Sequence, residues 1–162
     1  MTGVRDNADV IAPPPLIALG AVVLGLLLDW LMPAYVLYLL LSLTERILIG
    51  IVLVAAGAAM VVGALRGFRS VGTDPEPWKP STALFTGGIY TWLRNPMYVG
   101  GTLLLAGIAI ALARDWMLVM VILSVVVLHF GVVLREERYL EGKFGDTYRQ
   151  YKSRVPRYGW PF

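Results

Sequence analysis

Charged residues are nearly absent from four long apolar runs of the chain, and polar stretches separate these runs. A helix of about 20 apolar residues is long enough to cross a bilayer. The first run follows Pro13-Pro14-Pro15, and proline is tolerated in the first turn of a helix. We therefore predict an all-α integral membrane fold with about four transmembrane helices, over residues 14–32, 46–66, 97–113 and 115–135.

The segments between these runs differ in length and character. Pro33 ends the first run, and residues 34–43 are apolar but too short to span; re-entrant, interfacial or external-loop placement is possible, and we favour the last two. Thr44 and Glu45 resemble an N-cap and a first-turn acid. Residues 66–95 are polar and rich in proline, so we expect them in water or against protein. Arg114 and Asp115 predict a tight turn.

Composition supports a single membrane domain spanning residues 1–162. The chain is 57% hydrophobic and only 15% charged, which is too apolar for an ordinary soluble domain. A cleaved signal peptide is the alternative for the first run, but the preceding residues are not basic and no cleavage site follows, so we expect a retained helix. The absence of cysteine excludes disulfides and thiolate metal sites. No basic run indicates nucleic-acid binding.

The basic residues predict the orientation of the helices. Arg46 and Arg114 lie in the two short connections at one end of the predicted bundle. The other twelve fall at the opposite end, which the positive-inside rule places in the cytoplasm. We expect an inner-membrane protein, bacterial in type, with both termini and the 66–95 loop cytoplasmic. These twelve are Arg5, Arg66, Arg69, Lys79, Arg94, Arg135, Arg138, Lys143, Arg149, Lys152, Arg154 and Arg157.

The stretch "RNPMYVGG", Arg94 to Gly101, concentrates special chemistry at the start of the third run. Pro96 restricts Asn95 away from helical geometry and favours a helix that starts there. Gly100 removes a side chain from the first turns, so a backbone or a ligand can approach. The N–H groups of a helix N-terminus suit an anion. The alternative is an ordinary loop end with an interfacial Tyr98.

A second polar group follows the fourth run in "LHFGVVLREERYL". Glu136 and Glu137 come directly after the apolar residues, and His129 lies seven residues earlier, on nearly the same helix face. The three are candidate catalytic residues: the carboxylates could hold a cationic or amine-bearing ligand at the membrane boundary, and a histidine in a span is costly. The alternatives are a solvated charge cluster and a structural histidine. The tail beyond adds aromatic residues that anchor to headgroups or hold a cation, including Trp160 and Phe162.

Together these segments resemble the isoprenylcysteine carboxyl methyltransferase and phospholipid methyltransferase superfamily. The resemblance covers roughly the C-terminal half of the chain, and two separated motifs agree with it in order and spacing. The first motif contributes Gly88, Tyr90, Arg94, Asn95, Pro96, Tyr98 and Gly100. The second contributes Glu136, Glu137, Leu140, Phe144, Gly145, Tyr148 and Tyr151.

This resemblance implies a methyltransferase that binds S-adenosylmethionine between residues 87–101 and 129–158. The implied cofactor-binding residues are Gly88, Tyr90, Arg94, Asn95, Pro96, Tyr98, Gly100, Glu136, Glu137, Tyr148 and Tyr151. Arg94 or the helix N-terminus would pair with the methionine carboxylate, and a glutamate would take the ammonium or the ribose hydroxyls. Glu136, Glu137 or His129 could receive a proton from the acceptor. The expected acceptor is lipid-like or a small apolar molecule.

Two departures from the superfamily pattern affect the substrate. Asn95 stands where histidine is frequent, and an amide cannot act as a base near neutral pH. Val132 stands where the eukaryotic isoprenylcysteine enzymes have an arginine with a substrate role, which weakens a prenylated carboxylate as acceptor. The alternatives left open are a non-catalytic scaffold or lipid-binding protein, and a relative of the sterol reductases. The sequence leaves the oligomeric state undetermined.

Overall fold

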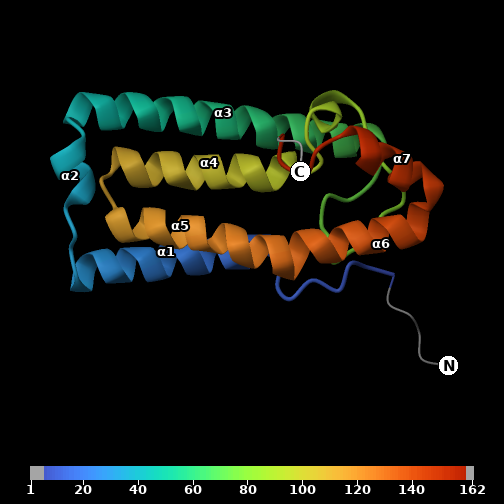
Figure 1. Ribbon diagram of the computed structural model, residues 1–162, viewed down its shortest axis with the longest axis horizontal. Coiled ribbons are helices and arrows are strands. Elements are labelled where there is room, and N and C mark those ends of the chain that lie inside the picture. Colours follow the sequence, from blue (N-terminus) through green and yellow to red (C-terminus); the bar gives the residue numbers. More distant parts are fainter. Residues whose placement is uncertain (1–5, 160–162) are drawn as a thin grey trace.

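The computed structural model describes residues 6–159, and the regular structure of that part is helical throughout. Arg5, Trp160 and Phe162, which entered the sequence analysis, lie outside the described residues. Four helical rods lie side by side in the order α1, α5, α4, α3 (Figure 1). The elements are α1 Pro14–Leu31, α2 Val36–Leu40, α3 Leu43–Ser70, η1 Gly88–Thr91, α4 Pro96–Ala111, α5 Asp115–Leu128, η2 His129–Val133, α6 Leu134–Phe144 and α7 Asp146–Arg154.

Three helical stretches are long and apolar enough to cross a membrane, namely Pro14–Leu31, Leu43–Ser70 and Asp115–Phe144. The predicted third span is α4, which is apolar but has only 16 residues. At about 1.5 Å per residue it is roughly 24 Å long, shorter than a bilayer core. The predicted all-helical membrane architecture is thus confirmed with three to four apolar helices.

The start of α3 corrects one prediction. Ser42, and not Thr44, is the N-cap, because its hydroxyl accepts a hydrogen bond from Glu45 N at 3.3 Å. The Glu45 carboxylate accepts in return from Ser42 N at 2.8 Å. This reciprocal capping box starts the helix several residues before the predicted boundary at 46. Glu45 does lie in the first turn, as predicted.

The connections at this end of the bundle are short. Residues 34–43 contain α2, a single five-residue helix that links α1 to α3 at one end of the bundle (Figure 1). The Asp115 carboxylate accepts hydrogen bonds from Val36 N and Leu37 N, at 3.1 and 2.9 Å. Helices α4 and α5 are joined by only three residues, 112–114.

A glycine seam lets α3 and α4 pack closely. A Cβ on Gly100 would lie 2.8 Å from Gly57 O, and a Cβ on Gly107 would lie 2.9 Å from Gly50 O. Both distances are too short for a real side chain, so only glycine permits this separation of the two backbones. The seam fixes the first turn of α4 against the last half of α3, where the chain leaves the bundle.

The fourth rod continues beyond the bundle. Helix α5 passes through the π-helical turn η2 into α6 without a break, beyond the predicted end of the span at residue 135. Gly145, at φ 55°, then reverses the chain into α7. The long connection between α3 and η1 and the segment after α7 lie at this same end (Figure 1).

Candidate functional site

The two sequence motifs meet at the end of the bundle opposite α2. Arg94 N donates to Pro156 O at 3.0 Å, and Asn95 Nδ2 donates to Arg157 O at 3.2 Å. These bonds tie the segment before α4 to the segment after α7. The predicted meeting of the 66–95 loop and the tail at one end of the bundle is therefore present in the fold.

A small polar cavity lies where these segments meet, with a free volume of about 60 Å³. Its walls come from the α3–η1 connection, the first turn of α4, α6 and α7. Eight of the residues predicted for a cofactor site line it: Tyr90, Arg94, Asn95, Tyr98, Glu136, Glu137, Tyr148 and Tyr151. The fold thus gathers residues that are up to 61 positions apart, as in the bond from Tyr151 Oη to Tyr90 O.

Glu137 is held between two arginines. Arg94 Nη1 lies 2.8 Å from Glu137 Oε1, and both side chains are buried, at 6% and 7% exposure. Arg157 makes two parallel hydrogen bonds to the same carboxylate, from Nε at 2.9 Å and from Nη2 at 2.8 Å. The hydrogen bonds that Arg157 donates to the Glu137 carboxylate raise the pKa of Arg157 above its usual range. One carboxylate thus links the segment before α4 to the segment after α7 through charge-assisted contacts.

Arg94 retains hydrogen-bonding capacity inside the cavity. Within the described residues, its buried Nε and Nη1 atoms make no hydrogen bond of acceptable geometry, although Nη1 is close to Glu137. A buried donor without an acceptor is costly, and native proteins satisfy such groups with protein, water or a ligand. The unsatisfied N–H groups of Arg94 are therefore suited to an anionic group in the cavity.

Glu136 has different surroundings from Glu137. Its Oε2 accepts a hydrogen bond from the Tyr98 hydroxyl at 2.8 Å, which joins α6 to the first turn of α4. Within residues 6–159, no arginine or lysine forms an ion pair with Glu136. The two neighbouring glutamates of the motif thus differ: one is neutralised by two guanidinium groups, and the other faces a phenol.

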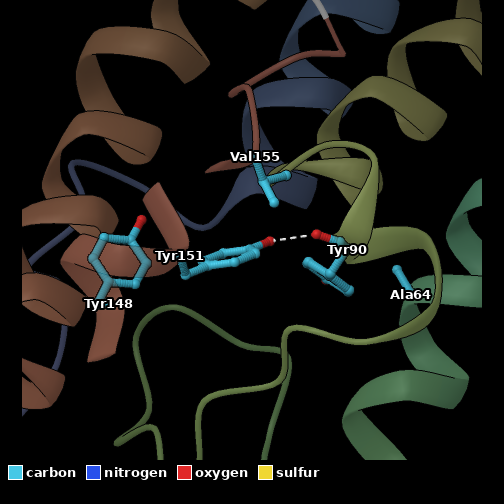
Figure 2. Close-up of a cluster of buried hydrophobic side chains, with 5 residues drawn as sticks. All are labelled: Ala64, Tyr90, Tyr148, Tyr151 and Val155. Atoms are coloured by element: carbon cyan, nitrogen blue, oxygen red, sulfur yellow. Dashed lines mark hydrogen bonds between the residues drawn. The ribbon is translucent and has the colours of Figure 1, made fainter. Parts of the chain in front are cut away.

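Aromatic side chains form one wall of the cavity. Figure 2 shows Tyr151 between Tyr148 and Tyr90, with its hydroxyl directed at the Tyr90 carbonyl. That hydrogen bond is 2.7 Å long, and the ring of Tyr90 packs edge-on against Phe68 and Phe85. Burial raises the pKa of all three tyrosine hydroxyls, so they remain neutral hydrogen-bond donors. Flat, neutral rings of this kind suit a planar ligand group.

The α3–η1 connection closes the cavity from the outside. Asp74, Glu76 and Phe85 come from this segment and line the cavity. Glu76 is paired with Lys79 at 2.6 Å. The segment is held at Ser81 N, which donates to the Tyr139 hydroxyl at 3.1 Å, and at Pro77 O, which accepts from Ala8 N at 3.2 Å.

A second, apolar cavity adjoins the first, with a volume of about 430 Å³. It lies among the first turns of α1, the first half of α4 and the last half of α5. Five residues line both cavities: Pro75, Glu76, Pro77, Met97 and Tyr98. The polar cavity and the apolar cavity therefore share part of their walls.

Four predicted site residues lie outside the polar cavity. Gly88, at φ 55°, starts η1, and Pro96 is fully buried at the start of α4. Gly100 packs against α3, so its missing side chain serves helix packing. His129 Nδ1 lies 2.8 Å from the Tyr158 hydroxyl. The π-helical turn that begins at His129 shifts its face relative to Glu136. The cofactor and catalytic roles predicted for these residues stay predictions.

Sequence reasoning missed several residues of the site. Arg157 was counted only as a positive charge of the tail, although a carboxylate buried at a helix start requires a cationic partner. Asp74 and Glu76 belong to a loop with no recognisable motif, and Phe68 and Phe85 were not singled out. Only a fold that places these segments beside α6 reveals their part in the cavity.

Comparison with known proteins decides the family. The sequence profile described as "Phospholipid methyltransferase" matches residues 45–147, more than half of the chain. The chain belongs to the phospholipid methyltransferase family. The family consists of membrane methyltransferases that use S-adenosylmethionine, so the resemblance noted in the sequence is confirmed. The match runs from the start of α3 to the start of α7 and includes both glutamates.

Two further proteins are similar to part of this chain. An uncharacterised protein of Haemophilus influenzae is 39% identical over 62 residues, which are 38% of this chain and 98% of that protein. Protein-S-isoprenylcysteine O-methyltransferase of Schizosaccharomyces pombe is 36% identical over 75 residues, 45% of this chain and 31% of that protein. The chain therefore aligns with less than a third of the Schizosaccharomyces enzyme. No solved structure matches.

Proposed function

We propose that this protein is an S-adenosylmethionine-dependent methyltransferase that modifies a lipid-like or small apolar acceptor. The polar cavity is the proposed cofactor site, and the apolar cavity is the proposed acceptor site. The observation that carries the proposal is Arg94, a buried cation with unsatisfied donors in a cavity walled by tyrosine rings. Family membership and the neighbouring apolar cavity support it.

The residues of the polar cavity fit the chemistry of the cofactor. Arg94 would hold the methionine carboxylate, and Asn95 or a cavity carboxylate would take hydroxyl or ammonium groups. Tyr90, Tyr148 and Tyr151 would pack against the adenine ring or the sulfonium. When bound, the cofactor supplies an electrophilic methyl group, and the protein contributes position and exclusion of water.

The cavity must widen before it can admit such a ligand. Its free volume is about 60 Å³, whereas ligand pockets usually measure about 300–1,000 Å³. The connection between α3 and η1 is the wall that we expect to move, because it contains no regular helix between residues 71 and 87. Helices α3 and α4 are fixed by their glycine seam.

The apolar cavity gives the acceptor a route from the bilayer. Its lining includes Leu104, Leu105 and Leu128 from α4 and α5, so an alkyl or isoprenoid chain would find apolar contacts there. Such an acceptor could place its reactive group at the shared wall while its chain stays among the helices. A soluble polar acceptor would gain nothing from this arrangement.

Binding and turnover test the proposal together. S-adenosylmethionine, or its demethylated product, is expected to raise the melting temperature of the detergent-solubilised protein by mass action. Labelled cofactor with a bacterial membrane lipid extract is expected to give a labelled lipid. Arg94→Ala should abolish the thermal shift, whereas Arg138→Gln, on the exposed side of α6, should not. Binding of lipid without any cofactor shift would instead indicate a lipid-binding scaffold.

The orientation is a separate part of the proposal. We place the polar cavity on the cytoplasmic side, where the cofactor is made, because most of the basic residues lie at that end. Reporter fusions after Ser70 and after Phe162 should report cytoplasm, and a fusion at Arg114 should report the opposite side. An external tail would separate the cavity from its proposed cofactor.

A further inference from the structure

Tyr98 is the hydroxyl-bearing residue that the two cavities share. It lies in the first turn of α4 and lines both the polar cavity and the apolar one. Of the five residues in the shared wall, Pro75, Pro77 and Met97 carry no ionisable group, and Glu76 is already paired with Lys79. A group that approaches through the apolar cavity therefore meets the phenol of Tyr98 at the boundary.

The partner of Tyr98 is a carboxylate with capacity to accept a proton. The Tyr98 hydroxyl donates to Glu136 Oε2 at 2.8 Å, and the described part of the chain supplies Glu136 with no cation. Glu137 is unsuited to this task, because both of its carboxylate oxygens already accept from Arg157 and one of them also lies beside Arg94. The adjacent glutamates thus have different roles: Glu136 is available to accept a proton, and Glu137 pairs with the two arginines.

We propose that Tyr98 and Glu136 form a proton relay between the two cavities. The inference rests on the proposed function and names the chemistry of its acceptor: a nucleophile that must lose a proton, such as an amine, thiol or hydroxyl, carried on an apolar body. A carboxylate acceptor reacts as the anion and needs no such relay. The geometry therefore assigns Tyr98 a catalytic role in addition to any contact with the cofactor.

The proposed reaction transfers one methyl group and one proton. A new bond forms between the nucleophilic atom and the methyl carbon, and the bond from that carbon to the sulfonium sulfur breaks, with the electron pair left on sulfur. The proton of the nucleophile passes to the Tyr98 oxygen, while the proton of that hydroxyl passes to Glu136. Glu136 then holds one proton, which it returns to water when the cavity opens, and Tyr98 is again neutral.

The surroundings of Glu136 determine how the relay responds to pH. Tyr98 faces it from α4, and Tyr90 and Arg94 face the same cavity from the segment before α4. Asp74 and Glu76 face the cavity from the α3–η1 connection, Tyr148 faces it from α7, and Glu137 is the neighbour on α6. The relay requires Glu136 as the anion, so the rate should fall on the acid side as Glu136 becomes protonated.

The test compares wild type with Tyr98→Phe and Glu136→Gln in detergent, with labelled S-adenosylmethionine and a bacterial membrane lipid extract. Cofactor affinity is measured by calorimetry, and the initial rate is measured across pH. Both variants should bind cofactor within about threefold of wild type and lose roughly a hundredfold in rate. The acid-side fall in rate should disappear in Glu136→Gln. Tyr38→Phe, at the far end of the bundle, controls for loss of a phenol.

The outcomes separate the relay from the proposed function. No cofactor binding and no transfer by wild type would overturn both. Transfer by wild type with full rates in Tyr98→Phe and Glu136→Gln would overturn the relay alone. Loss of cofactor binding in Glu136→Gln would make Glu136 a cofactor ligand and would also overturn it. Transfer confined to an added prenylated cysteine carboxylate would contradict the assigned acceptor class.

Discussion

The two ends of the bundle each bury an arginine, but in different surroundings. Arg46, near the start of α3, is 5% exposed, and its guanidinium lies 4.1 Å from the centre of the Tyr38 ring. The side chain of Arg94, before α4, is 6% exposed, but it lies beside Glu137 and lines the polar cavity. Both carry a buried Nε without a hydrogen-bond partner among the described residues.

The carboxylates explain the difference between these ends. At the end of the bundle that holds Arg46, Asp29 accepts from Trp116 N and Met117 N, and Asp115 accepts from the backbone of α2. These acids cap helix starts, so none forms an ion pair with Arg46 within the described residues. At the other end Glu137 faces two arginines instead. Arg94 thus combines unsatisfied donors with an ionic partner and a place in a cavity wall, and for this reason we propose Arg94, and not Arg46, as the ligand-binding arginine.

The largest expected effect comes from Glu137→Gln. This change leaves two guanidinium groups without their counter-charge, and breaking a buried pair typically costs about 3–5 kcal/mol. We expect a fall of roughly 10 °C in melting temperature, together with weaker cofactor binding. Glu141→Gln, a partly exposed carboxylate of the same helix, should cost about 1 kcal/mol or less. Equal melting temperatures for the two variants would contradict the role given to Glu137.

Arg94→Gln should affect binding more than folding. Arg157 still neutralises Glu137 in this variant, so the loss of stability should be smaller than in Glu137→Gln. A lost hydrogen bond to a charged ligand group costs about 1.5–3 kcal/mol, which corresponds to roughly a ten- to hundredfold lower cofactor affinity. Calorimetric titration with S-adenosylmethionine measures this affinity. Unchanged affinity in a folded variant would remove Arg94 from the cofactor site.

Arg46→Gln should show the opposite behaviour. Its contact with Tyr38 is a cation–π interaction, worth about 0.5–2 kcal/mol. We expect a small fall in melting temperature and no change in cofactor affinity, both measured beside Arg94→Gln. A loss of cofactor affinity here would break the distinction between the two ends of the bundle.

The smallest effect is expected at a helix cap. Asp115→Asn retains one oxygen acceptor for the start of α2 but loses the charge and the second acceptor. Such caps contribute about 1 kcal/mol. The variant should melt slightly earlier, with methyl transfer unchanged. Loss of methyl transfer in a folded variant would show that the α2 end of the bundle influences the polar cavity.

Much of the fold could be predicted because its signals are local. The apolar runs and Pro96 placed the helices within a few residues. The errors arose where a hydrogen bond decides a boundary: the Ser42–Glu45 capping box moved the start of α3 away from Thr44. The π-helical turn at His129 could not be predicted either, since no residue type in that stretch specifies it.

The site was predictable only as far as its motifs extend. Arg94, Glu136 and Glu137 were identified by the family resemblance and line the same cavity. Gly100 was expected to let a backbone or a ligand approach, and it is the backbone of α3 that lies against it, because a glycine in the sequence does not indicate which of the two approaches. Arg157 lies 20 residues from the carboxylate that it binds, and only the reversal at Gly145 brings them together.

The wall shared by the two cavities has a thermodynamic consequence. Pro75, Glu76 and Pro77 form part of both cavities, so a shift that widens one changes the shape of the other. Under the proposed function, cofactor in the polar cavity and acceptor in the apolar cavity would then be coupled. Each would alter the binding affinity of the other by the same factor. We expect heterotropic cooperativity between methyl donor and acceptor, visible as a cofactor dissociation constant that depends on acceptor concentration. The membrane would thereby govern how much cofactor the protein holds.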